Sequence, residues 1–364
     1  MVWQLCSAFI ERHSPCSGCS LNDVGGAVDA GHVRVYHERD GEWEQVGADL
    51  HGSATGDHFG WSVSLSTNAT VLAVVATPVD GVNGPNSGRV IVYSWSGSVW
   101  QNMGPPIDGD AAYDVFGTSI ALSGDGTILA AGAWGNDARG DSAGCVQVFA
   151  WNGTNWNQRG QDLDGSFAGD AFGTAVALSS DGSVVACGAP RFYSEIPGYV
   201  RIYGWNGSTW MQRGSQQTGF RAHDYFGESI SLSRDGRVLA VGAGNGNYVV
   251  VYRNDGTDWF KIGQTIFALA FNDQFGESIA LSLDGETVII GAWLNDSNGF
   301  ASGHALVYRL SPTRQVWVPV GQERRKATDM VSRCLFRTMV GELPWERFSM
   351  TETEVTLEAY ECLQ

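Results

Sequence analysis

A block of about fifty residues recurs along this chain, and no other feature of the 364-residue sequence limits the fold as strongly. Each copy contains D-x-F-G, an alternating S-V-A-L-S, an x-D-G turn and an apolar L-A-V-G-A, followed by G-x-V-x-V-Y and W-x-Q-x-G. The aspartates that open the copies are spaced by 49 to 57 residues: Asp57, Asp114, Asp170, Asp224 and Asp273. Self-similarity at a fixed period of this length indicates a repeat architecture.

Each copy carries four strand signals. The S-V-A-L-S segment alternates small polar and apolar residues, which is typical of a strand with one buried face. Asp-Gly and Asn-Gly pairs supply the backbone geometry of tight hairpin turns. The L-A-V-G-A segment is apolar throughout, and we expect it to be the strand nearest a crowded central axis. Four antiparallel strands repeated radially form a propeller blade. The sequence therefore predicts an all-β fold, a β-propeller of four-stranded blades.

The repeated motif, present in full or nearly so five times between residues 18 and 322, resembles the FG-GAP repeat of integrin α-chain N-terminal propellers. The resemblance implies closure with seven blades and, in some blades, calcium loops rich in carboxylates. The matching turns here keep one carboxylate each, at Asp125, Asp181, Asp235 and Asp284. One carboxylate is too few to hold calcium tightly, because this ion takes several oxygen ligands. We expect no metal and no cofactor, and regard these four residues as weak calcium candidates.

Both ends of the chain depart from the repeat. When the codons of residues 323–364 are read one base earlier, the genetic code forces glycine near positions 330, 339 and 345 and aspartate near 350. These spacings match those of Gly276, Gly285, Gly291 and Asp296. Residues 1–17, read one base later, also permit a repeat core. We therefore expect 18–322 to be the propeller and 1–17 to be an out-of-frame remnant. The tail 323–364 is expected to be out of frame and disordered or non-native. Counting both ends predicts about seven blades, the first and last disrupted.

Residues that recur in every copy are expected to serve the fold. The D-x-F-G aspartates should bond backbone amides, and the phenylalanines of the same motif should pack between blades, because every blade needs these contacts. For the recurring tryptophans, inter-blade packing competes with a surface that stacks on sugars: Trp43, Trp100, Trp156, Trp210, Trp259 and Trp317.

Segments that do not repeat are the better candidates for ligand binding. Residues 77–87, 134–143, 191–197 and 293–302 connect the apolar strand to the next hairpin and should cluster on one face. Loops on a rigid scaffold commonly carry binding residues. The side chains suspected of ligand contact in these loops are Asp80, Asn136, Asp137, Arg191, Tyr193, Asn295 and Asp296.

Charge and sequence signals narrow the partners. A net charge of −17 argues against nucleic acid, which carries the same sign. No apolar run approaches the roughly 20 residues of a membrane helix, so we expect no transmembrane segment. Four N-glycosylation sequons favour export weakly, and we expect a secreted or cell-surface location: Asn68, Asn152, Asn206 and Asn295.

These observations favour a non-catalytic module that recognises a protein or a glycan through its loop face. No catalytic motif such as G-x-S-x-G is present. Two alternatives remain open. One is a structural repeat array within a larger secreted protein. The other is a propeller enzyme of the glycosidase or lyase type, which would need non-repeated carboxylates that converge near the axis.

Overall fold

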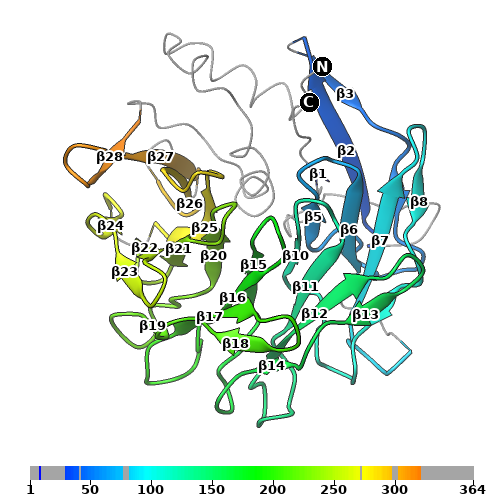
Figure 1. Cartoon of the computed structure of the whole chain (residues 1–364), viewed down its shortest axis with the longest axis horizontal. Helices are drawn as coiled ribbons and strands as arrows, with labels where there is room; N and C mark the ends of the chain where they lie inside the picture. Colours follow the sequence, from blue (N-terminus) through cyan, green and yellow to red (C-terminus); the bar gives the residue numbers. More distant parts are fainter. Residues whose placement is uncertain are drawn as a thin grey trace.

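The computed structural model contains six antiparallel sheets arranged around a central axis (Figure 1). It describes residues 29–40, 42–76, 82–270, 273–296 and 302–320, together with the backbone of strand β1. Among these residues no helix has the length and apolar character needed to cross a membrane. The predicted all-β propeller is confirmed.

The first blade contains β1 (Ala8–Phe9), β2 (His32–Arg39), β3 (Glu42–Gln45) and β4 (Leu50–His51). The second contains β5 (Val63–Leu65), β6 (Val71–Ala76), β7 (Arg89–Trp95), β8 (Trp100–Asn102) and β9 (Ile107–Asp108). The third contains β10 (Ile120–Leu122), β11 (Ile128–Ala133), β12 (Cys145–Trp151), β13 (Trp156–Gln158) and β14 (Leu163–Asp164).

The fourth blade contains β15 (Ala175–Leu178), β16 (Val184–Ala189), β17 (Tyr199–Trp205), β18 (Trp210–Gln212) and β19 (Gln217–Thr218). The fifth contains β20 (Ser229–Leu232), β21 (Val238–Ala243), β22 (Tyr248–Asn254), β23 (Trp259–Lys261) and β24 (Ile266–Phe267). The sixth contains β25 (Phe275–Leu281), β26 (Thr287–Ala292), β27 (His304–Leu310) and β28 (Trp317–Pro319).

The expected number of about seven blades is wrong, because the described residues form six sheets. Five blades begin at a D-x-F-G core, and one is built on the first hairpin, β2 and β3, which pairs with β1. The last hairpin completes the sixth blade, whose four strands pair in full, so this blade is not disrupted. The strand β1 falls within the predicted out-of-frame segment 1–17, and the tail 323–364 lies outside the described residues. The out-of-frame origin of both segments stays a prediction.

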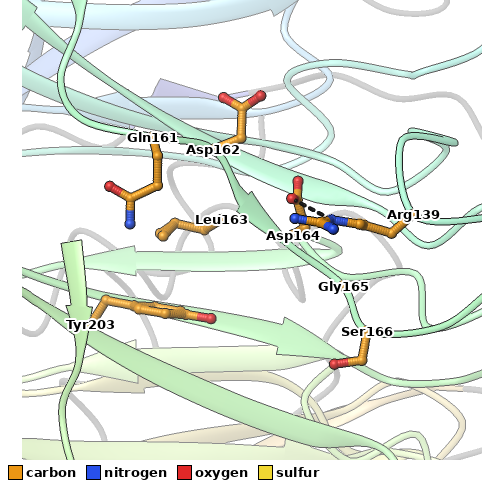
Figure 2. Close-up of a pocket in the computed structure, with 8 residues that line it drawn as sticks. All are labelled: Arg139, Gln161, Asp162, Leu163, Asp164, Gly165, Ser166 and Tyr203. Carbon is orange, nitrogen blue, oxygen red and sulfur yellow. Dashed lines mark hydrogen bonds and ion pairs between the residues drawn. The ribbon is translucent and has the colours of Figure 1, made fainter. Parts of the chain in front are cut away.

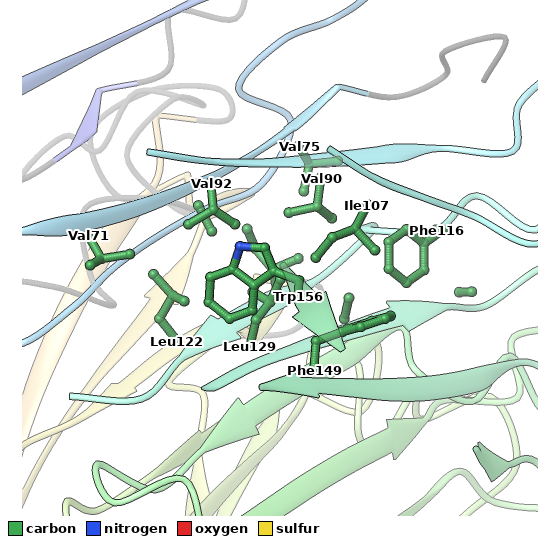
Figure 3. Packing of buried hydrophobic residues seen from close by; sticks show 14 of the residues in the cluster. Val71, Val75, Val90, Val92, Ile107, Phe116, Leu122, Leu129, Phe149 and Trp156 are labelled. Carbon is green, nitrogen blue, oxygen red and sulfur yellow. The ribbon is translucent and has the colours of Figure 1, made fainter. Parts of the chain in front are cut away.

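The strand nearest the axis is the S-V-A-L-S strand, not L-A-V-G-A as expected. The innermost strands β5, β10, β15, β20 and β25 contact one another in succession around the axis (Figure 1). The L-A-V-G-A strand is second and is buried on both faces. Alternate residues of β6 belong to two cores: Val71, Ala73 and Val75 pack against the third blade, and Leu72, Val74 and Ala76 against the first. Figure 3 shows the first of these cores. An apolar run thus reflects burial between blades.

The glycine of L-A-V-G-A marks a close approach of two backbones. A Cβ built on Gly132, Gly188 or Gly242 would lie 1.9 Å from a carbonyl oxygen of the next blade. That oxygen belongs to the glycine of the next D-x-F-G, for example Gly227 beside Gly188. In the second blade Val75 stands at this position, and its methyl groups lie against Gly117. In most of the described interfaces, the backbones of neighbouring blades therefore lie too close together for a side chain at this position.

The recurring tryptophans join neighbouring blades. In five blades the indole Nε1–H of the recurring tryptophan donates to a carbonyl of the preceding blade, as Trp210 does to Arg159 at 2.7 Å and Trp156 to Met103 at 2.9 Å. The same bond is made by Trp100, Trp259 and Trp317. These five rings are buried or half-buried. Inter-blade packing is therefore confirmed for them, and they do not form a sugar-stacking surface.

Candidate functional site

The D-x-F-G aspartates are buried and bond the backbone, as predicted, in three blades. Asp170 accepts the amides of Ser166 and Phe167 at 2.9 and 3.2 Å. Asp57 and Asp224 accept similar amides. The phenylalanines of the motif are almost fully buried between blades, which confirms that prediction: Phe59, Phe116, Phe172, Phe226 and Phe275. The repeated motif therefore serves the fold.

The weak calcium candidates are turn residues in the S-x-D-G hairpins. Asp125 accepts the Ser123 hydroxyl at 2.6 Å and the Thr127 amide at 3.0 Å. Burial acts to raise the pKa of Asp125, but these hydrogen bonds outweigh it and hold the pKa below its usual value. Asp181, Asp235 and Asp284 repeat the arrangement. In the described part of the chain no group of three or more His, Cys, Asp and Glu side chains is placed to hold a metal ion.

The D-x-F-G segments and the connections after the L-A-V-G-A strands lie at one end of the propeller, which we call the loop face. Hydrogen bonds tie the two sets of segments together. Asn136 Nδ2 donates to Asp114 at 3.0 Å, and Asn295 Nδ2 donates to Asp273 at 2.7 Å. The predicted clustering of these connections is confirmed for the described residues.

Three of the suspected ligand residues use their side chains in contacts that tie the loop face together. Arg191 is buried and its Nε lies 2.7 Å from Asp170, while its guanidinium stacks on the ring of Tyr199. Asn136 and Asn295 bind the aspartates named above. By contrast, Tyr193 is 96% exposed, and Asp137 and Asp296 are exposed. Asp80 lies outside the described residues.

A cavity of about 430 Å³ opens on the loop face between the second and third blades, and we call it the blade 2–3 cavity. Three connections line it: β6–β7, β9–β10 and β11–β12. The lining residues are Asn86, Tyr113, Val115, Trp134, Gly135, Asp137, Asp141 and Ser142. Of the suspected ligand residues, only Asp137 lines this cavity.

Tyr113 holds an unusual backbone conformation at the edge of this cavity. Its φ is +68°, and the same repeat position is glycine in two other connections, Gly56 at +79° and Gly169 at +75°. A non-glycine residue with this φ costs about 1–2 kcal/mol. Burial does not offset this cost, since Tyr113 is 62% exposed. The repeat pattern, which shows Tyr where others have Gly, is the signal that could have found it.

Five large apolar side chains are exposed on the connections of the loop face that run from β14 to β25. We call them the apolar patch: Phe167, Tyr193, Ile196, Phe220 and Leu269. Two of these connections, β16–β17 and β19–β20, are in contact: Glu195 Oε1 lies 3.7 Å from His223 Nε2, and Phe192 packs edge-on against Tyr225 with ring centroids 5.0 Å apart. Phe220 stacks on Tyr248 at 4.6 Å. Sequence reasoning identified only Tyr193 of this group.

A second cavity, of about 360 Å³, lies between the third and fourth blades (Figure 2). Its wall is polar, with Arg139 bound to Asp164 at 2.9 Å. Tyr203 lies on the opposite side of the cavity, and burial raises the pKa of Tyr203 to about 12. Arg201 donates to Asp164 O and to Ser166 Oγ beside it. Arg139 and Asp164 are thus paired with each other, and Arg201 is held by hydrogen bonds to uncharged groups.

Three of the four sequons are accessible. Asn68, Asn152 and Asn206 are exposed at hairpin turns. Asn295 is buried and its amide nitrogen is bound to Asp273, so the folded chain does not present it.

The sequence model of the FG-GAP repeat family matches residues 51–93, 106–149 and 269–308. The chain contains FG-GAP repeats. No curated protein sequence matches this FG-GAP propeller. Among solved structures it is similar to the periplasmic gluconolactonase PpgL of Pseudomonas aeruginosa, with 15% identity, 90% of this chain and 85% of that chain covered, and a TM-score of 0.56.

Two further solved structures are similar to the FG-GAP propeller. The β-propeller domain of Myceliophteria thermophila Cps50 (Swd1) has 11% identity, covers 90% of this chain and 89% of that chain, and gives a TM-score of 0.53. KlAtg21, solved in complex with a coiled-coil of AgAtg16, has 14% identity, with 83% and 79% covered and a TM-score of 0.54. At these identities the likeness concerns the fold alone.

Proposed function

We propose that this FG-GAP propeller is a non-catalytic recognition module, secreted or at the cell surface, that binds a protein partner through the apolar patch. The supporting observation is the exposure of five large apolar side chains on successive connections of the loop face, two of which are joined by Glu195 and His223. We infer that these side chains form one surface, and contiguous exposed apolar surface marks interaction sites in soluble proteins. Aromatic side chains are also enriched at the centres of interfaces.

The repeats themselves support a specific role for the patch. At the positions of Phe167 and Phe220, counted from the D-x-F-G aspartate, the first two copies have small or charged residues, such as Ala111 and Asp110. The fold therefore does not require these aromatic rings. Large exposed apolar side chains lower solubility, and their presence where other copies have small or charged residues is the expected signature of a binding surface.

Charge favours a partner with basic groups around an apolar centre. The chain carries a net charge of −17, and Glu195 lies within the patch loops. Complementary charge speeds association and selects partners. We therefore expect binding to weaken as salt rises.

The enzyme alternative rests on carboxylates near the axis. Glu228 and Glu277 follow D-x-F-G in the fifth and sixth blades, where the third and fourth have Thr118 and Thr174. Glu228 accepts the amide of Gly244 and so supports the β21–β22 turn. This structural use favours binding over catalysis. Lactone hydrolysis above the uncatalysed rate, lost in Glu228→Gln, would instead favour an enzyme.

The experiment is a screen of the purified chain against an array of extracellular protein domains, followed by affinity measurement. Tyr193→Ser combined with Leu269→Ser should weaken a specific interaction at least tenfold while leaving the Tm unchanged. Phe260→Ser, at an exposed apolar residue of the outer strand β23 away from the loop face, is the matched control. Equal loss in the patch and control variants, or no protein bound at all, would overturn the proposal.

A further inference from the structure

The blade 2–3 cavity has a different character from the apolar patch. Aromatic and carboxylate side chains line it together, since Tyr113 and Trp134 face the same space as Asp137 and Asp141. Its volume of about 430 Å³ lies within the usual range for small-ligand sites. Its ligand must therefore combine an apolar face with several polar groups.

The carboxylates of this cavity retain hydrogen-bonding capacity. Asp137 accepts the Ser142 amide at 2.7 Å, and Asp141 accepts the Ser142 hydroxyl at 3.2 Å. Each ionised carboxylate has about four acceptor sites, so both can also accept bonds from a ligand. Both carboxylates are exposed, so their remaining acceptor sites are accessible to hydroxyl or ammonium groups of a ligand.

Charge excludes an anionic ligand. None of the eight lining residues is a cation. Arg139, which belongs to the same β11–β12 connection, points into the neighbouring cavity and binds Asp164 at 2.9 Å (Figure 2). Two carboxylates without a cation repel phosphate, sulfate and carboxylate groups.

We propose that the blade 2–3 cavity binds a neutral or amine-bearing sugar ring. A pyranose has an apolar C–H face, which fits the exposed ring of Tyr113, and hydroxyl groups, which donate to Asp137 and Asp141. The strained backbone of Tyr113 places its ring at the cavity although glycine suffices for the fold at this position. His223 has the same backbone conformation at the equivalent position, so what distinguishes Tyr113 is that its side chain lines the cavity. This inference shares only the loop face with the proposed protein recognition, since the ligand, the blades and the residues differ.

The test is titration of the full chain with methyl glycosides of a neutral hexose, a 2-amino hexose and a hexuronic acid, followed by ligand-observed NMR. We expect the first two to bind and the acid to bind at least tenfold more weakly. Tyr113→Gly keeps the required φ while removing the ring, and should weaken binding at least tenfold with an unchanged or higher Tm. Asp141→Asn should weaken the amino sugar more than the neutral one.

His223→Gly is the matched control, because His223 has the same repeat position, with φ +60°, between the fourth and fifth blades. It should leave sugar binding unchanged. Preference for the acid, no sugar binding, or equal binding by Tyr113→Gly and the unaltered chain would overturn the inference. Those results leave protein binding through Tyr193 and Leu269 intact, so the two proposals fail separately.

Discussion

Substitution of Gly188 by alanine tests whether blade spacing is set by backbone contact. The added Cβ would lie 1.9 Å from the carbonyl oxygen of Gly227, far inside the 3.4 Å at which ordinary van der Waals contact begins. The obstacle is backbone of the next blade, which cannot rotate away as a side chain does. The fourth and fifth blades must therefore separate, and the core packed between them must loosen.

The expected cost follows from overpacking a close-packed interior. Inserted methyl groups commonly cost about 1–3 kcal/mol, and a backbone obstacle belongs at the upper end of this range. A loss of about 3 kcal/mol lowers the Tm of a protein of this size by roughly 4–5 °C, since the entropy of unfolding grows with chain length. The assay is thermal and urea unfolding followed by circular dichroism, with the slope m compared between variants.

Gly204 provides the matched control in the same blade. It lies in β17 and pairs with Val184, and the nearest atom to an added Cβ is Arg213 Cδ at 3.9 Å. Gly204→Ala should be neutral or stabilising by about 0.5 kcal/mol, because alanine restricts the unfolded chain. If Gly188→Ala and Gly204→Ala change stability equally, close approach of the blades does not explain the glycine.

Three further predictions concern the joints, the surface charges and the sequons. Trp210→Phe should cost about 1–2 kcal/mol in unfolding free energy, since it removes the bond to the Arg159 carbonyl while keeping most of the packing; the matched change at the exposed Met211 should cost little. The Arg34 guanidinium lowers the pKa of Asp49 to about 2, so the stabilisation from this carboxylate is present above pH 4 and is lost as pH falls toward 2. Urea unfolding of Asp49→Asn should therefore differ from the unaltered chain by less than about 1 kcal/mol at pH 6 and converge with it near pH 2. Expressed through a glycosylating secretory pathway, the chain should carry sugar at Asn152 or Asn206 but not at the buried Asn295, as intact-mass analysis of single Asn→Gln variants will show.

The structural role of the repeated residues could be predicted from the sequence, because a residue that recurs in every copy is expected to make a contact that every blade needs. Phe172 was predicted to pack between blades on this ground, and inter-blade packing was one of two interpretations of Trp210; both side chains are buried. The place of L-A-V-G-A was mistaken because an apolar strand looks the same at an axis as between two blades. Only the pairing of β15 with β16, and its contacts with the next innermost strand, decide the order.

The candidate sites were harder to predict, since they depend on neighbours distant in sequence. Arg191 was a candidate ligand residue, but the fold brings it to Asp170, where it is buried. Phe167 and Phe220 lie in segments that the repeat pattern predicts to be turns. Their exposure depends on how the neighbouring loops pack, which a single repeat does not reveal. The φ of Tyr113 becomes informative only beside Gly56 and Gly169.

The tryptophan bond between blades bears on how such a chain can change in number of repeats. Each indole donor is encoded in one copy and its acceptor in the copy before it. A duplicated copy therefore brings a donor for its predecessor and an acceptor for its successor, so it enters the ring without compensating substitutions. Deletion of a copy likewise rejoins two compatible halves. This hydrogen bond thus forms between any two neighbouring copies. We expect gain or loss of a whole blade to preserve it, whereas a substitution within one interface can remove it.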